Sequence, residues 1–244
     1  MDSELISNIK KLLDAYQKGL LCDTTMPEET APQFSNLEEK RIYYTLPMAL
    51  NYQRNSYTLW ESAKKTFEDK STHGVFNLNS VTSQNIPELR EKLTKHKLAL
   101  QPNKHIDTWS RVARGIKDNF HSLSNLFDKY DNDFLEIKNA IQIVHKKEFP
   151  YLSGPKIFNY WMFIMSTYGE VPLKNRSYIE IAPDTHVLQA SIKLKVISQK
   201  EADSMSRDTI SQIWRTLLKE STIDPIDVHS PLWFWSRSGF DYKL

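Results

Sequence analysis

Apolar residues recur every three or four positions along most of this chain. Residues 103–120 are an example, because Ile106, Trp109 and Ile116 fall on one face of a helix drawn through them. This spacing is typical of an amphipathic α-helix that buries one side. The same periodicity predicts helices over residues 3–20, 38–47, 57–67, 89–98, 123–130, 134–145, 185–196 and 203–219, with an apolar helix after Pro155 and a short aromatic helix near the C-terminus.

Two polar stretches interrupt this pattern. Residues 23–36 are rich in Pro and Thr, and residues 70–87 are polar and irregular, so both are predicted as loops. Ser198 and Glu201 have the spacing of a capping box at a helix start. Because no segment shows a convincing strand period, we expect an all-α protein with about ten helices of ordinary length.

The length and composition of the chain limit the classes of protein to which it can belong. With 244 residues, one domain or two closely packed lobes is expected. The single cysteine, Cys22, excludes a disulfide framework, a cysteine zinc site and a four-cysteine iron–sulfur cluster, and it suits a reducing intracellular location in the cytoplasm or nucleoid. We find no apolar run long enough for a membrane span and no signal-peptide core at the N-terminus, so no membrane association is expected. The net charge of +2 is too small to indicate nucleic-acid binding by itself.

Two residues between positions 149 and 194 carry candidate chemistry. Lys156 lies in the first turn of the apolar helix, where desolvation and the positive end of the helix dipole both disfavour an ammonium group. Such an amine can act as a nucleophile that forms a Schiff base. Asp184 is placed to cap the next helix, which would hold a carboxylate in a fixed position. In other proteins, a lysine in a first turn is more often a surface residue, and an aspartate before a helix is more often only a cap.

The two segments together resemble the helix-hairpin-helix DNA glycosylases. Gly154-Pro155-Lys156 takes the place of the family's hairpin that ends in Gly-x-Lys, although Gly154 is the one hairpin glycine kept. Pro183-Asp184-Thr185-His186-Val187 matches the family's catalytic aspartate segment almost residue for residue. The long separation of Lys156 and Asp184 is most like that of the archaeal 8-oxoguanine glycosylase branch, as are Ala49-Leu50-Asn51-Tyr52-Gln53 and the tail around Trp233.

The resemblance implies a two-lobed helical glycosylase without an iron–sulfur cluster. The central lobe is expected over approximately 105–196, and the second lobe over 1–104 plus 197–244. Lys156 would attack the sugar and Asp184 would stabilise the cationic transition state. The implied base-binding residues are Gln53, Phe163, Pro183, His229 and Trp233, and the implied DNA-backbone contacts are Lys147, Leu152, Ser153 and Gly154.

The expected partner is double-stranded DNA with a damaged base, bound by a monomer without a cofactor. No catalytic metal is expected, because His73, His121 and His145 lack metal-ligand spacing. His186 is expected to form a local hydrogen bond rather than to act as a base. Two other functions remain open: a non-catalytic helix-hairpin-helix DNA-binding protein, suggested by the degraded hairpin, and a glycosylase for an alkylated base, suggested by His229 at a position where the branch has an acid.

Overall fold

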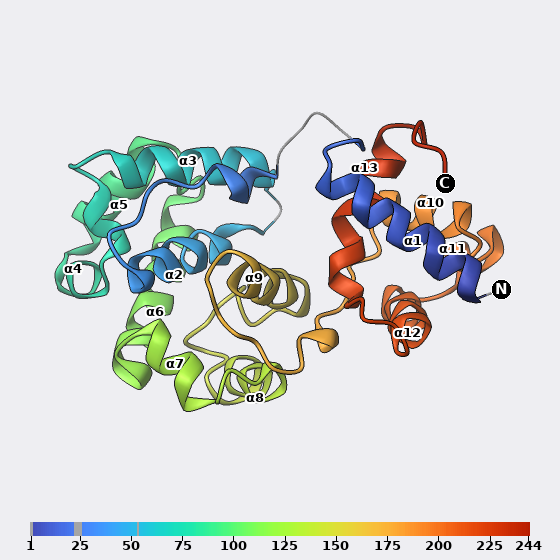
Figure 1. Ribbon diagram of the computed structural model, residues 1–244. Helices are drawn as coiled ribbons and strands as arrows, with labels where there is room; N and C mark the ends of the chain where they lie inside the picture. Colours follow the sequence, from blue (N-terminus) through green and yellow to red (C-terminus); the bar gives the residue numbers. More distant parts are fainter. Residues whose placement is uncertain (1, 22–25, 53) are drawn as a thin grey trace. The chain divides into compact units, whose positions relative to one another are not determined.

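The chain folds into helices joined by turns and loops (Figure 1). This computed structural model describes residues 2–21, 26–52 and 54–244. Within those ranges no strand occurs, and Asp133 and Lys174 form an isolated β-bridge. The predicted all-α class is therefore confirmed.

The helices divide between two compact units. One unit comprises Met1–Thr24 and Arg176–Leu244, and the other comprises Thr25–Asn175. These bounds differ from the expected lobes, 105–196 and 1–104 plus 197–244. The difference arises because the helices between residues 37 and 95 pack on the same core as those between 102 and 167. The helix after Asp184 instead packs against His229–Arg237, which also packs against Asp2–Gln17.

The larger unit, Thr25–Asn175, has an aromatic core. Trp60, Trp109 and Tyr43 are almost completely buried, and the Trp109 indole Nε1 donates to the Val75 carbonyl at 3.0 Å. Its helices are α2 (Leu37–Thr45), α3 (Ser56–Glu68), α4 (Leu78–Ser83), α5 (Ile86–Lys95), α6 (Pro102–Phe120), α7 (Leu123–Lys129), α8 (Phe134–Asn139) and α9 (Pro155–Thr167), with 3₁₀ helices Pro27–Thr30, Met48–Leu50 and His73–Phe76.

Gly115 lets the segment before α9 approach α6 closely. A Cβ at this position would lie 2.8 Å from the Glu148 Cβ and 3.3 Å from the Glu148 carbonyl oxygen. A side chain of any size at position 115 would therefore displace the backbone that leads to Lys156.

The smaller unit packs α10 (Thr185–Lys193) against α13 (His229–Arg237) and α1 (Asp2–Gln17) against α13. The rings of Tyr16 and Phe234 stack with centroids 5.8 Å apart, and the Trp214 indole donates to Ser191 Oγ at 3.0 Å. The remaining helices are α11 (Gln199–Ser204), α12 (Arg207–Leu218) and the 3₁₀ helices Arg176–Tyr178 and Pro225–Val228.

Local structure departs from the prediction at 70–87 and 134–145, and the loop predicted over 23–36 contains the 3₁₀ helix Pro27–Thr30. Residues 70–87 are not a loop throughout, because α4 forms there with an Asn77 cap on the Ser80 N–H at 3.0 Å. This helix is too short and polar to show a period, and Val81 is its buried residue. The helix expected over 134–145 becomes a π-helix at Ala140–Val144. The Ser198–Glu201 capping box is confirmed.

None of the helices in the described ranges is both long and apolar enough to cross a membrane.

Candidate functional site

Lys156 lies in the first turn of α9, as predicted. Gly154 is the N-cap with φ −70° and ψ 140°, Pro155 is the first helical residue, and the Phe158 N–H donates to the Gly154 carbonyl at 2.8 Å. The side chain is exposed, which is the commoner position for a lysine in a first turn, so the desolvation considered for its amine is not present. Phe158 and Trp161 lie on the buried face of α9. Lys156 is two residues before Phe158, which places it about 200° around the helix from Phe158.

The N–H groups of the turn before α9 form hydrogen bonds within the turn. Those of Leu152, Ser153 and Gly154 donate to the carbonyls of Pro150, Phe149 and Tyr151 at 2.8, 2.9 and 2.9 Å. A phosphate bound by these donors would have to replace the three bonds. The Lys156 and Ile157 N–H groups, by contrast, lie at helix positions that have no intrahelical acceptor.

The turn's side chains differ in exposure. Leu152 is fully buried and anchors the turn in the core, Ser153 is half-buried, and Lys147 is exposed. The Lys147 carbonyl accepts from the Arg111 guanidinium on α6. The turn is thus held on the same helix that carries Gly115.

Phe163 is half-buried on α9. Its ring stacks nearly parallel to that of Tyr160, with centroids 6.3 Å apart, and meets Tyr168 edge-on at 6.4 Å. Part of an aromatic surface therefore remains accessible on α9.

Asp184 caps α10 as predicted. Its Oδ1 accepts from the Val187 N–H at 3.0 Å, and its own N–H donates to the Ala182 carbonyl at 2.8 Å. The side chain is half-buried and Pro183 before it is buried. The carboxylate is consequently fixed in direction, and its second oxygen keeps acceptor capacity.

The face of α13 toward α10 holds Trp233. The His186 ring meets Trp233 edge-on at 5.2 Å, and the Arg237 guanidinium lies 4.8 Å from the Trp233 ring centroid. Trp233 is half-buried, whereas its neighbours Phe234 and Trp235 are buried.

His186 does not bond locally as expected. Its Nδ1 lies 3.2 Å from Ser236 Oγ on α13, and that hydroxyl donates to Gln189 Oε1 at 2.8 Å. Because the hydroxyl hydrogen is committed to Gln189, Nδ1–H is the donor to Ser236. His229 is half-buried and opens α13.

The predicted residues separate into two groups. Lys147, Phe163, Lys156 and the 152–154 turn belong to the larger unit, and the remaining described ones, Pro183, Asp184, His229 and Trp233, belong to the smaller unit. Gln53 lies outside the described residues.

Two features were missed by sequence reasoning. Tyr52, Tyr151 and Lys104 come together at the turn before α9, and Glu28 is a buried carboxyl group. Neither leaves a sequence signal, because the three clustered residues are far apart along the chain and Glu28 sits in an acidic, Pro-containing stretch that resembles a surface loop.

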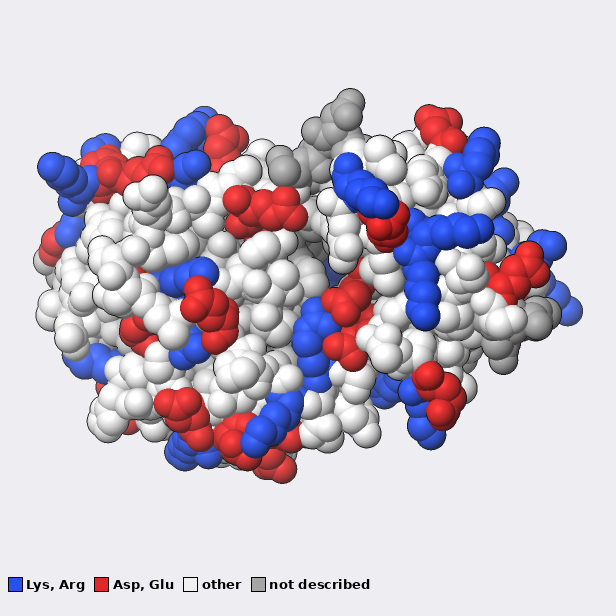
Figure 2. All heavy atoms as spheres, in the orientation of Figure 1, with Lys and Arg blue, Asp and Glu red and all other residues white. Residues whose placement is uncertain are grey.

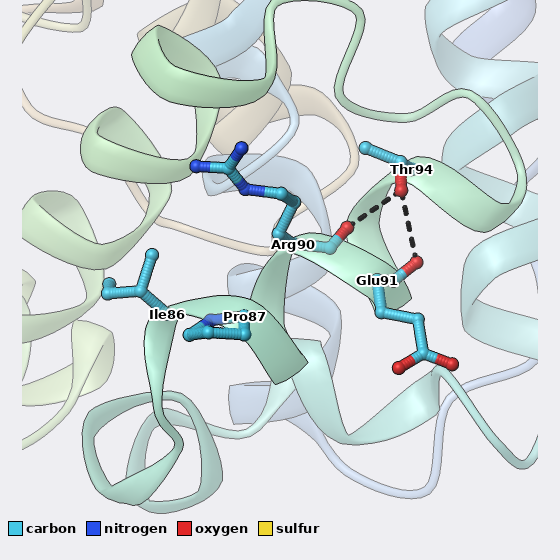
Figure 3. Close-up of a pocket in the computed structure, with 5 residues that line it drawn as sticks. All are labelled: Ile86, Pro87, Arg90, Glu91 and Thr94. Carbon is cyan, nitrogen blue, oxygen red and sulfur yellow. Dashed lines mark hydrogen bonds between the residues drawn. The ribbon is translucent and has the colours of Figure 1, made fainter.

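The surface carries little other candidate chemistry. A depression on α5 is lined by Ile86, Pro87, Arg90, Glu91 and Thr94, and the Thr94 hydroxyl bonds the Arg90 and Glu91 carbonyls there (Figure 3). All five residues come from one helix, so the depression brings no distant groups together. Basic and acidic side chains are interspersed on the face shown in Figure 2. In the part of the chain that the structure describes, no three His, Cys, Asp or Glu residues are grouped to hold a metal ion.

The sequence matches no model of a known protein family, and a search of curated proteins found no significant match.

Proposed function

We propose that the protein is a base-excision DNA glycosylase with lyase activity at the resulting abasic site, acting on an oxidised purine such as 8-oxoguanine. One observation carries the proposal: the exposed amine of Lys156 stands in the first turn of an apolar helix, and the Asp184 carboxylate caps a later one. The helix-hairpin-helix glycosylases, which this sequence resembles, use a lysine and an aspartate at these two positions.

The chemistry follows from the two groups. The damaged nucleotide is turned out of the duplex so that its sugar becomes accessible. The Lys156 Nζ forms a bond to the sugar C1′ while the bond from C1′ to the base breaks, and the base leaves with the proton that the attacking nitrogen loses. The Asp184 carboxylate stabilises the positive charge that develops on the sugar. Opening of the sugar ring gives a Schiff base, from which loss of a proton at C2′ expels the 3′ phosphate.

Local structure supports these roles. The side chain of Lys156 is exposed and accessible to DNA, and the helix start beside it has two N–H groups without intrahelical acceptors. Asp184 is held as an acceptor by Val187. The Trp233 ring, which the His186 ring meets edge-on, offers a partly exposed aromatic face for a flat base.

Borohydride reduction in the presence of an 8-oxoguanine duplex tests the proposal. The parent protein is expected to form a covalent adduct with DNA, because reduction fixes the Schiff base. Lys156→Gln is expected to form none, whereas Lys129→Gln, which removes another exposed amine of the same unit, is expected to behave as the parent. Absence of an adduct with the parent, or an equal adduct with Lys156→Gln, contradicts the lyase mechanism.

A second candidate, a DNA-binding protein without catalysis, is favoured by the turn itself. The N–H groups of 152–154 already donate to carbonyls of residues 149–151, and these are the donors that a functional hairpin would offer to phosphate. This candidate predicts salt-dependent duplex binding with no base released from any lesion. A glycosylase for an alkylated base, suggested by His229, would be separated from both by identifying the released base by mass spectrometry.

A further inference from the structure

Two tyrosines and a lysine meet on the surface of the larger unit. The Tyr52 and Tyr151 rings lie 5.1 Å apart between centroids with an interplanar angle of 33°. The Lys104 Nζ, from the first turn of α6, lies 5.3 Å from the Tyr52 centroid and 4.9 Å from the Tyr151 centroid. We call these three residues the tyrosine cluster.

The tyrosine cluster is open to solvent, unlike most aromatic groups of this unit. Tyr52 is 43% exposed and Lys104 is exposed. A second lysine, Lys129, lies over two rings, but one of them, Phe120, is buried. The tyrosine cluster therefore combines an accessible aromatic surface with an accessible cation.

The backbone at Tyr151 indicates that its position is imposed by the surroundings. Tyr151 has φ +60°, in the left-handed region that a bulky residue rarely adopts. Leu152, fully buried, and the 2.9 Å bond from the Gly154 N–H to the Tyr151 carbonyl hold this conformation. Such a residue at a surface turn is a candidate for function.

We propose that the tyrosine cluster binds an unpaired nucleobase of a DNA strand, stacked on Tyr52, with the adjoining phosphate neutralised by Lys104. The choice of DNA rests on the proposed function, but the site uses neither the Lys156 nor the Asp184 chemistry. Every base offers a flat π-face, so stacking on tyrosine needs no particular sequence.

The charges around the tyrosine cluster favour an anionic ligand. Burial lowers the pKa of His105, which is next to Lys104 on α6, and the positive charges of Arg54 and Lys104 lower it further. The Lys156 side chain and the N–H groups that lack intrahelical acceptors at the start of α9 follow Tyr151 by only a few residues. A strand that stacks a base on Tyr52 would therefore meet positive charge.

The test compares two DNA ligands that differ only in a short single-stranded tail beside a duplex. In one the tail carries bases, and in the other it consists of abasic units with the same phosphates. The parent is expected to bind the base-bearing tail about 5- to 150-fold more tightly, which is the range for stacking one base on an aromatic side chain. Tyr52→Leu is expected to bind both tails equally. Tyr178→Leu, which alters a similarly exposed tyrosine beneath an arginine, is expected to keep the preference.

The role of Lys104 is tested by measuring how DNA binding depends on salt concentration. Lys104→Gln is expected to lower the salt dependence of binding by about one phosphate contact for both tails, and Lys129→Gln is expected to leave it unchanged. A 2-aminopurine in the tail reports stacking without any variant, because its fluorescence is quenched when it stacks.

Two results overturn the inference: equal binding of the two tails by the parent, or a preference that survives in Tyr52→Leu. An unquenched 2-aminopurine in the bound tail overturns it even where Tyr52→Leu does not fold. The outcome is separable from that of the proposed function. Borohydride trapping that fails while the tail preference holds contradicts only the glycosylase chemistry, and the reverse contradicts only the tyrosine cluster.

Discussion

Replacing Glu28 with glutamine is expected to stabilise the protein above about pH 7, because the native carboxyl group is buried with half of its hydrogen-bonding capacity unused. Glu28 is 1% exposed in the 3₁₀ helix Pro27–Thr30. Its Oε1 accepts from the Trp60 indole at 3.1 Å, whereas Oε2 has no hydrogen-bond partner among the described residues. The Tyr44 hydroxyl bonds the Glu28 carbonyl and not its carboxyl group.

The magnitude follows from the pKa. Desolvation by burial raises the pKa of Glu28 from about 4.5 to about 7, against the opposing effects of hydrogen bonds from the backbone and Trp60. The folded protein therefore binds this proton more tightly than the unfolded chain. The contribution of Glu28 to the free energy of unfolding is largest below about pH 4.5, falls between about pH 4.5 and 7, and stays low above about pH 7. Each pKa unit is worth about 1.4 kcal/mol, so ionisation of Glu28 costs roughly 3 kcal/mol at about pH 8.

Urea unfolding of the parent and of Glu28→Gln at about pH 5 and about pH 8 measures this effect. The glutamine keeps an acceptor for Trp60 and is neutral at both pH values. The variant is expected to exceed the parent by up to about 3 kcal/mol at pH 8 and to differ little at pH 5. Comparison with the parent at each pH cancels other titrations, including that of His105, whose lowered pKa acts in the opposite direction.

Glu29→Gln is the matched control, because Glu29 is the exposed neighbour. It is expected to change the unfolding free energy by less than about 0.5 kcal/mol at either pH. A Glu28→Gln variant that is less stable than the parent at pH 8, or whose advantage over the parent does not grow between pH 5 and pH 8, would contradict the role assigned to Glu28.

Two further substitutions test the fold and the site. Gly115→Ala would place its Cβ 2.8 Å from the Glu148 Cβ. Overpacking costs about 1–3 kcal/mol and the higher helix propensity of alanine returns about 1 kcal/mol, so the free energy of chemical unfolding is expected to fall by up to about 2 kcal/mol. A variant more stable than the parent would contradict the close packing at Gly115. Asp184→Asn is expected to keep the cap on Val187 and the melting temperature but to lose base release at least about 100-fold, whereas Asp184→Ala should also lose about 1 kcal/mol of stability. Equal base release by the parent and Asp184→Asn would leave Asp184 with only its capping role.

Sequence periodicity predicted most helices because their buried faces repeat regularly. The Ile106, Trp109 and Ile116 face of α6 is buried as the spacing indicated. Short polar helices such as α4 have too few buried residues to show a period. The division into units was not predictable from local pattern, because it depends on which distant helices share a core.

The candidate site shows the same limit. The capping role of Asp184 was predictable because a cap is a local arrangement of one side chain and the next turn. The exposure of Lys156 was left open by the sequence, since it depends on which face of α9 meets the core. The tyrosine cluster depends on contacts between residues such as Tyr52 and Tyr151 that are remote in the chain, so it became visible only in the folded structure.

The most direct test of the glycosylase proposal is to find which residue becomes attached to DNA. After borohydride reduction with an 8-oxoguanine duplex, the adduct would be digested and the DNA-linked peptide identified by mass spectrometry. We predict a single cross-link at Lys156, whose amine is exposed at the start of α9. A cross-link at another lysine, or no adduct under conditions that trap a known glycosylase on the same duplex, would contradict the account.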